Sequence, residues 1–169
     1  SLMGKANIDN IVVATAMAYL LGESLFSIQR AIEKLKPIPH RLELIKSDFA
    51  YVIDDSYNSN LEGFKTALDV LKSFKGKKIV VSPGMIELGS MQAETNFEAG
   101  EMVAKVADIF VIMNETNKKS LYDGAVSAGM EKERIYFATT RKEQTNLLKN
   151  ILTQGDVVLF ENDFPDNVK

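Results

Sequence analysis

Tyr51-Val52-Ile53-Asp54-Asp55-Ser56-Tyr57-Asn58-Ser59-Asn60 is the stretch of sequence that decides the fold. Its first three residues are apolar or aromatic, favour a β-strand, and run directly into two carboxylates. Apolar residues then recur at helical spacing from Leu61 to Phe74. The stretch therefore predicts a buried strand, a polar turn and a helix. Ligands of open α/β sheets bind at the carboxyl ends of strands, so this turn is the first candidate site.

Asp54 and Asp55 are adjacent carboxylates that repel each other at this strand end. One interpretation is structural: both are cap-type residues on a surface turn, where such residues are common. The other is functional: one acid caps the following helix, and its neighbour faces a ribose or a metal ion. We favour the functional interpretation, because a purely structural role explains two adjacent acids poorly.

The composition limits the classes of function. The chain has 169 residues, 46% of them hydrophobic, which suffices for one domain or for one domain plus part of another. The net charge is −3 without a basic cluster, so we expect no nucleic-acid partner. Without cysteine and with His40 as the only histidine, we predict no metal site and expect a reducing, cytoplasmic location. No apolar run is long enough to span a membrane.

Residues 1–39 have the pattern of two helices, at 7–21 and 27–35, and Pro37 and Pro39 then end the helical pattern. Two helices are too few to form a domain. We therefore predict that residues 1–39 are the helical tail of a preceding domain and that a second domain spans residues 40–169. Residues 1–3 have the composition of a vector-derived remnant, so we expect the natural protein to start elsewhere.

From Arg41 onward, short apolar runs alternate with helical patterns. The expected strands are residues 42–45, 50–53, 79–82, 109–113, 135–138 and 157–160, and the expected helices are 61–74, 92–106, 118–128 and 142–152. This alternation predicts an α/β fold: a Rossmann-like, doubly wound, mainly parallel sheet of about six strands, preceded by two helices. The first two strands have a tight connection, so we expect one antiparallel edge strand.

Polar residues follow most of the predicted strands. They are Asp54 to Asn60, Pro83 to Gly89, Asn114, Thr139 and Glu161 to Asp163. Carboxyl ends of parallel strands share one edge of a sheet, so these residues are expected to line one cleft. The chain has no G-x-x-x-x-G-K-[ST] motif and does not bind nucleotide phosphates through a P-loop.

Four residues outside that edge have open interpretations. Arg41 is suited to binding a phosphate, although its spacing favours a salt bridge to Glu43 or Asp48. His40 has the character of a partly exposed linker residue. Asn7 and Asn10 lie where the first helix begins, so at least one of them is expected to cap it.

Four motifs, in the right order, resemble those of the Mur ligase family and cover nearly the whole chain. They are Gly4 to Asn10, similar to the family's G-x-H-N-x-x-N helix; Pro39 to Glu43, similar to its hinge arginine motif; Asp54 to Asn60, close to the D-D-S-Y-N-A-N of its dipeptide-adding branch; and Pro83 to Gly89, similar to its G-D-M-x-E-L-G loop.

The resemblance implies the end of a central ATPase domain followed by a complete C-terminal domain. The parent would be an ATP-dependent, amide-forming ligase of peptidoglycan synthesis that uses ATP and Mg. It would phosphorylate the carboxylate of UDP-MurNAc-tripeptide, and the amine of D-Ala-D-Ala would attack the acyl phosphate. The family's P-loop and magnesium ligands would lie in the missing N-terminal and central domains.

Matching residue by residue, the resemblance assigns seven site residues. They are Asn7 and Asn10 for the adenine, Asp55 for the ribose hydroxyls, Arg41 for the transferring phosphate, and Tyr57, Asn58 and Asn60 for the cleft of the incoming dipeptide. With only a ribose carboxylate and an adenine edge left, the isolated chain should fold, show no ligase activity and bind ATP in the millimolar range or weaker.

Several positions depart from the family pattern. Pro83-Gly84 stands where Gly-Asp is usual, Ala6 and Asn96 stand where histidine is frequent, and Glu161 to Asn167 replaces a K-G-S-R type segment. The last change removes basic residues near the amine-donor side. A paralogue with a different amine donor therefore remains an alternative, as does an α/β ligand-binding module without chemistry.

Overall fold

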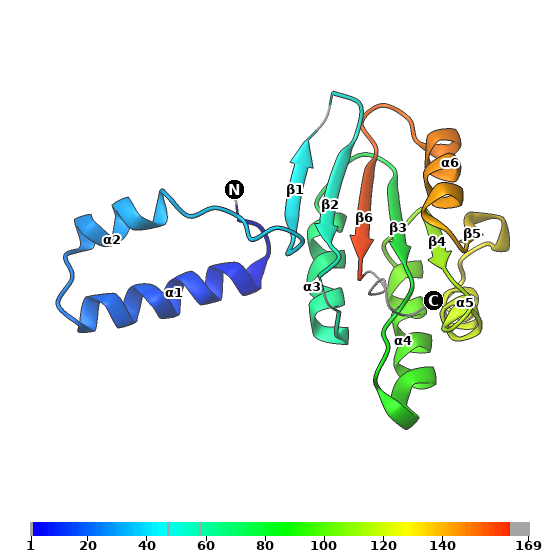
Figure 1. Cartoon of the computed structure of the whole chain (residues 1–169), viewed down its shortest axis with the longest axis horizontal. Coiled ribbons are helices and arrows are strands. Elements are labelled where there is room, and N and C mark those ends of the chain that lie inside the picture. Colours follow the sequence, from blue (N-terminus) through cyan, green and yellow to red (C-terminus); the bar gives the residue numbers. More distant parts are fainter. Residues whose placement is uncertain (1, 47, 58, 163–169) are drawn as a thin grey trace.

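A computed structural model describes residues 2–46, 48–57 and 59–162, with six strands and six α-helices in these ranges (Figure 1). In chain order they are α1 (Lys5–Leu20), α2 (Leu25–Ile32), β1 (Glu43–Lys46), β2 (Tyr51–Asp55), α3 (Leu61–Lys72), β3 (Lys78–Ser82), α4 (Gln92–Ala104), β4 (Ile109–Met113), α5 (Lys118–Ser127), β5 (Ile135–Ala138), α6 (Arg141–Ile151) and β6 (Val157–Glu161). Short 3-10 turns at Gly89–Met91 and Lys132–Arg134 precede α4 and β5.

The six strands form one sheet in the order β1-β2-β6-β3-β4-β5. Only β1 pairs antiparallel with its neighbour, and it lies at an edge. The predicted fold class is therefore confirmed, including the antiparallel edge strand. β6, the last strand in sequence, lies between β2 and β3 and joins the two halves of the sheet.

Strand alternation divides the core into two layers. Ile53, Val80 and Leu159 pack on one face of the sheet with apolar residues of α3, α4 and α5. Val81 and Val158 face the opposite side, where the apolar residues of α6 pack. Successive side chains of a strand point to opposite faces, so strands covered on both faces need continuous apolar runs.

On the second face, α6 is the only one of the described helices that covers the sheet. This helix packs against β3, β4, β5 and β6. Phe160 of β6 and Val81 of β3 contribute to the walls of a cavity on this side, together with Leu148 of α6. The uneven distribution of helices therefore leaves a cleft above β2 and β6.

Helices α1 and α2 form a hairpin that extends away from the sheet (Figure 1). Many of its apolar side chains are exposed, among them Ile8, Val12, Val13, Met17, Leu20, Leu25 and Phe26. Two helices alone cannot cover their own apolar surface, so the hairpin is not a domain by itself. No helix in the described part of the chain is long and apolar enough to cross a membrane.

The expected asparagine cap of the first helix is wrong. The helix starts earlier than the sequence pattern indicated, at Lys5, and its N-cap residue is Gly4. Asn7 therefore lies inside the first turn, where its Nδ2 donates a hydrogen bond of 2.7 Å to the carbonyl of Met3. Asn10 lies further along the same helix.

Candidate functional site

The two adjacent acids at the end of β2 belong to two different cavities. Asp54 lines the cleft on the α6 side, whereas Asp55 lines a second cavity between the sheet and the α1–α2 hairpin. Neighbouring residues of a strand point to opposite faces, so β2 sends one carboxylate to each side. Their mutual repulsion is reduced in this way without either one leaving the strand.

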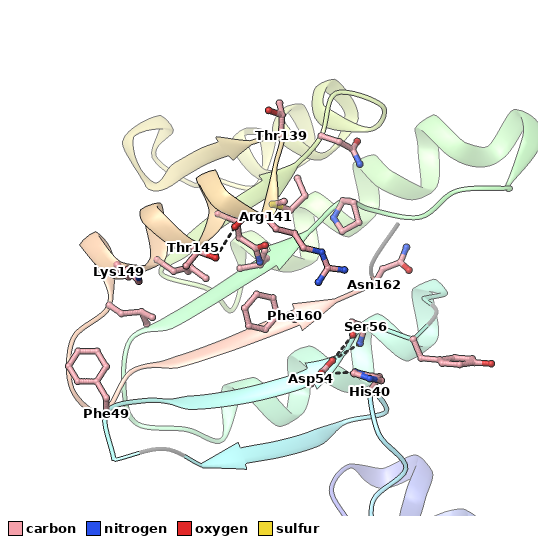
Figure 2. A pocket seen from close by; sticks show the side chains of 18 residues that line it. His40, Phe49, Asp54, Ser56, Thr139, Arg141, Thr145, Lys149, Phe160 and Asn162 are labelled. Atoms are coloured by element: carbon pink, nitrogen blue, oxygen red, sulfur yellow. Dashed lines mark hydrogen bonds and ion pairs between the residues drawn. The ribbon is translucent and has the colours of Figure 1, made fainter. Parts of the chain in front are cut away.

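Both acids hold the segment that precedes β1. The Oδ2 atom of Asp54 lies 2.9 Å from Nδ1 of His40, and its Oδ1 atom accepts a bond of 2.6 Å from the hydroxyl of Ser56 (Figure 2). The Oδ1 atom of Asp55 accepts a bond of 3.0 Å from the backbone N–H of Leu42. Each carboxylate therefore has a structural partner.

Neither acid caps α3, and that part of the prediction is wrong. The cap is Asn60, whose Oδ1 accepts a hydrogen bond of 2.8 Å from the N–H of Gly63. The acids lie too far before the first turn of α3, and donors from residues 40–42 and 56 satisfy them instead.

Residues 40–42 form a strained hinge. His40 and Leu42 have φ angles of 63° and 47°, in the left-handed region that non-glycine residues rarely adopt. Such backbone persists where surrounding contacts fix it, and here Asp54 and Asp55 supply them. The hinge holds Arg41 between the two strained residues.

Arg41 stacks on an aromatic ring. Its guanidinium carbon lies 4.4 Å from the centroid of the Tyr57 ring, a cation–π distance. Among the described residues Arg41 forms no ion pair, so the salt bridge favoured by spacing is wrong. Glu43 instead accepts a hydrogen bond of 3.3 Å at its Oε2 from the backbone N–H of His40. Asp48 follows the end of β1 that is remote from Arg41.

Five of the assigned residues line the second cavity together: Asn7, Asn10, Arg41, Asp55 and Asn60. They come from α1, the hinge, β2 and the N-terminal end of α3. The cavity has a volume of about 1000 Å³, which suits a small-molecule ligand. Tyr57 lines the first cavity instead, and Asn58 lies outside the described residues.

The first cavity collects the polar residues expected at the carboxyl edge. Pro83, Asn114, Thr139 and Asn162 line it together with Asp54. The expectation of one common cleft is wrong in part, because Asp55 and Asn60 line the second cavity. Figure 2 shows Arg141, the first residue of α6, extending from the helix toward the middle of this cleft. Sequence reasoning did not single out Arg141. Of residues 83–89, Pro83 alone is part of this lining.

The loop after β3 is held by two buried amides that sequence reasoning did not connect to it. Asn96 of α4 accepts a bond from the N–H of Met85 and donates to the carbonyl of Met85, both at 2.8 Å. Asn117 donates to the carbonyls of Pro83 and Met85, both at 3.0 Å. A polar residue among the buried positions of α4, in line with Ala99, Gly100 and Val103, was the available signal for Asn96.

Gly84 is required in this loop. Its φ is 78°, and a Cβ atom there would lie 2.2 Å from Oδ1 of Asn96. The motif departure at this position is therefore matched to the buried amide, because the glycine leaves room for it. Asn162 also binds the loop, because its Nδ2 donates a hydrogen bond of 2.7 Å to the carbonyl of Gly84.

Glu161, the last residue of β6, is 1% exposed. The sequence placed it at the edge of the sheet, but its burial was not expected. Its Oε1 accepts a hydrogen bond of 2.6 Å from the hydroxyl of Ser59. Burial and the nearby charge of Asp55 raise the pKa of Glu161 well above its ordinary value. An acid that ends an otherwise apolar buried strand was the available signal. Residues 163–167 of the same departure lie outside the described residues.

The pKa of Asp55 is also raised, primarily because the carboxyl is partly buried. The N–H of Leu42 and the charge of Arg41 act in the opposite direction and favour the carboxylate. The described residues contain no group of three or more side chains placed to hold a metal ion. The second cavity thus offers the amides of three asparagines, the carboxylates of Glu23 and Asp55, and the cations of Lys36 and Arg41.

A scan against protein families finds the Mur ligase, glutamate ligase domain, over residues 40–161. The chain belongs to the Mur ligase family. The UDP-N-acetylmuramoyl-tripeptide–D-alanyl-D-alanine ligase of Bacillus subtilis is 29% identical over 167 residues, which cover 95% of this chain and 35% of the relative. The corresponding ligase of Escherichia coli is 34% identical over 109 residues, covering 64% of this chain and 24% of the relative.

Solved structures agree with this placement. The MurF ligase of Thermotoga maritima in complex with ADP is 26% identical, with a TM-score of 0.80 over 96% of this chain and 36% of that protein. A MurF structure from Acinetobacter baumannii has a TM-score of 0.83 at 26% identity, over 96% of this chain and 36% of that protein. This Mur ligase chain thus spans about a third of the length of these relatives.

Proposed function

We propose that this chain is the C-terminal part of an ATP-dependent, amide-forming ligase of peptidoglycan precursor synthesis, acting in the cytoplasm. Residues 1–39 end the central ATPase domain, and residues 40–169 form the domain that closes over the nucleotide. The parent joins D-Ala-D-Ala to UDP-MurNAc-tripeptide through an acyl phosphate. The piece by itself lacks the groups needed for turnover.

The observation that carries this proposal is the shared cavity of Asn7, Asn10, Arg41 and Asp55. A carboxylate accepts hydrogen bonds from both hydroxyls of a ribose, and amide side chains pair with the edge of an adenine. The T. maritima relative, whose matched region has the same fold, was solved with ADP. These contacts support a nucleotide, with ATP as the substrate of the parent.

We infer that Arg41, which lines this cavity, contacts the transferring phosphate. It is exposed, carries a permanent charge and is held by the strained hinge and by the Tyr57 ring. Phosphoryl transfer depends on positioning and on neutralising the charge of the transferring group. An arginine fixed before the substrate arrives meets both requirements. Mg would be held by residues outside this chain, and it supplies further charge neutralisation when bound.

The exposed apolar hairpin supports the missing domains as partners. Val12, Val13 and Phe26 are at least 60% exposed, although they are large apolar residues. Contiguous exposed apolar surface marks an interaction site. We assign it to the remainder of the central domain in the same polypeptide, because the curated relatives extend well beyond the matched region.

A second candidate function is a ligase of the same family that adds a different amine. D-Ala-D-Ala is favoured by the B. subtilis and E. coli relatives. A UDP-N-acetylmuramoylalanine–D-glutamate ligase of Marinobacter nauticus is also 27% identical over 160 residues, which cover 94% of this chain and 34% of that relative. Asn60 is engaged as a helix cap and Tyr57 by Arg41. Asn60 lines the second cavity and Tyr57 the first, so the two do not share one donor cleft in this structure.

The test is phosphate release by the full-length parent with ATP, Mg and UDP-MurNAc-tripeptide. D-Ala-D-Ala should support turnover, and Arg41→Lys should reduce kcat by at least tenfold, because lysine lacks the planar fork. The exposed Arg30→Lys on α2 is the matched control and should behave as wild type. Turnover with UDP-MurNAc-alanine and D-glutamate, but not with the tripeptide and the dipeptide, would select the second candidate. No turnover with any amine would contradict the ligase proposal.

A second experiment addresses the chain by itself. Calorimetric titration with Mg-ATP should give a Kd in the millimolar range or weaker, because a few hydrogen bonds contribute only about 0.5–1.5 kcal/mol each. Asp55→Ala is the control for the ribose contact. Micromolar binding that this substitution abolishes would show that the chain by itself holds a complete nucleotide site. It would refute the proposal that the missing domains of the parent supply most of the contacts to ATP.

A further inference from the structure

Asp55 has a second acid beside it at the same edge of the sheet. In the parallel pairing of β2 with β6, Asp55 lies opposite Glu161. Both residues follow the alternation of Ile53 and Leu159, which face α3, α4 and α5. The two carboxyl groups therefore point to the same side of the sheet, and each acts on the pKa of the other.

The surroundings of Glu161 offer too few donors for a carboxylate. Ser59 donates to Oε1 at 2.6 Å, whereas Oε2 is buried and has no hydrogen-bond partner in the described part of the chain. The charged groups acting on Asp55 are Arg41, which favours its carboxylate, and Asp54, which opposes it. No cation is among the groups that act on Glu161 itself. Two carboxyl groups can hydrogen-bond only when one of them carries a proton.

We propose that Glu161 is a positioning residue of the nucleotide cavity: it keeps its proton at neutral pH and donates it to Asp55, which stays ionised and fixed toward the ribose. The pair then carries one negative charge instead of two. Ser59 locks the neutral acid from the other side and ties the loop before α3 to β6. This inference rests on the proposed function in one respect, the contact of Asp55 with ribose hydroxyls.

The proton can be tested without any nucleotide, by urea unfolding of this chain between pH 4 and 8.5. Because the pKa of Glu161 is raised in the folded state, its contribution to the free energy of unfolding is fully present below the ordinary glutamate value of 4.5. This contribution is lost as the pH rises through the folded-state pKa. Glu161→Gln cannot ionise. The ratio of its unfolding constant to that of the wild type should therefore fall by about tenfold or more from low to high pH, since one pKa unit corresponds to about a tenfold change.

Glu98→Gln, an exposed site on α4, is the matched control and should give a ratio independent of pH. Asp55→Asn removes the neighbouring charge and should shrink the pH dependence caused by Glu161. A ratio for Glu161→Gln that is flat across the range would overturn the proposal. Should this variant fail to fold, the ¹³C titration of the Glu161 carboxyl in the wild type decides the question: a midpoint at or below the ordinary value refutes a retained proton.

The positioning role is tested in the full-length parent with two nucleotides. Glu161→Leu removes the donor, so the KM for ATP should rise by about tenfold, the value of one well-placed hydrogen bond, with kcat nearly unchanged. Glu161→Gln keeps a donor and should restore the wild-type KM. The KM for 2′,3′-dideoxy-ATP, which lacks the ribose hydroxyls, should be the same in both variants as in the wild type. An unchanged KM for ATP in Glu161→Leu would refute the positioning role. If Asp55→Asn leaves the preference for ATP over the dideoxy analogue unaltered, the ribose contact of the proposed function fails, while the pH experiment still decides the proton.

Discussion

Replacing Asn96 by alanine should destabilise the fold through a single orphaned backbone group. The Asn96 amide makes three hydrogen bonds of 2.8 Å: it accepts from the N–H of Met85 and donates to the carbonyls of Met85 and Gln92. The carbonyl of Met85 keeps its bond from Asn117 in the variant, at 3.0 Å. The N–H of Met85 has no second acceptor among the described residues, so it loses its only bond.

The magnitude follows from this count. A buried donor left unsatisfied costs about 1–3 kcal/mol. Asn96 is fully buried, so the deleted amide also leaves a small cavity, which adds roughly 1 kcal/mol. We expect Asn96→Ala to lower the free energy of unfolding by about 2–4 kcal/mol.

The assay is urea unfolding of the chain at pH 7, monitored by far-UV circular dichroism. With an m value of about 2 kcal/mol per molar urea, the midpoint should fall by about 1–2 M. Glu98→Gln, two residues further along the same helix and exposed, is the matched control and should stay within about 0.5 kcal/mol of the wild type. An Asn96→Ala variant as stable as this control would refute the reasoning, because the loop after β3 would then not depend on the amide.

Three further predictions concern other contacts. Gly84→Ala should cost at least about 2 kcal/mol by urea unfolding, from its positive φ and the clash with Asn96, and the double variant Gly84→Ala/Asn96→Ala should be less destabilised than the sum of the two. Tyr57→Ala should weaken the positioning of Arg41 by about 0.5–1 kcal/mol, measured as a two- to fivefold lower kcat of the parent, whereas Tyr57→Phe keeps the ring and should not. Asp156 accepts hydrogen bonds of 2.7 and 2.9 Å from Thr153 and lies 3.2 Å from Nζ of Lys77. Burial raises the pKa of Asp156, but these donors lower it by more, so that it lies below the ordinary 3.8. Asp156→Asn should therefore cost about 1.5–3 kcal/mol at pH 7, and the difference should shrink as the pH falls below 3.8 in acid-unfolding curves.

The sheet was predictable because its strands are buried on both faces. A strand such as β4, residues 109–113, must be apolar throughout, and its bounds match the expected ones. The helices were predicted less sharply, because helix ends depend on local caps. The first helix began two residues before the expected start, since the glycine at position 4 allowed an earlier turn.

The roles of individual polar residues were harder to predict, since their partners lie far away in sequence. Asp54 and Asp55 are satisfied by His40 and by the N–H of Leu42, which are 14 and 13 residues away. Ser59 and Glu161 are separated by 102 residues. Spacing along the chain carries no information on such pairs. The edge of the sheet was predictable, because strand ends follow from the apolar pattern, but the division of its residues between two cavities required the register.

The central place of β6 also affects the order in which the molecule can assemble during synthesis. A ribosome makes β1, β2 and α3 first, and β3, β4 and β5 next, but the bridge between these two groups of strands is the strand made last. Until residues 157–161 emerge, Asp55 has no Glu161 beside it, and β2 lacks its parallel neighbour. The sheet and the pairing of Asp55 with Glu161 are therefore completed in the same late step. A nascent chain arrested before residue 157 should expose β2 and β3 as open edges, which are the surfaces that chaperones protect and that aggregation uses.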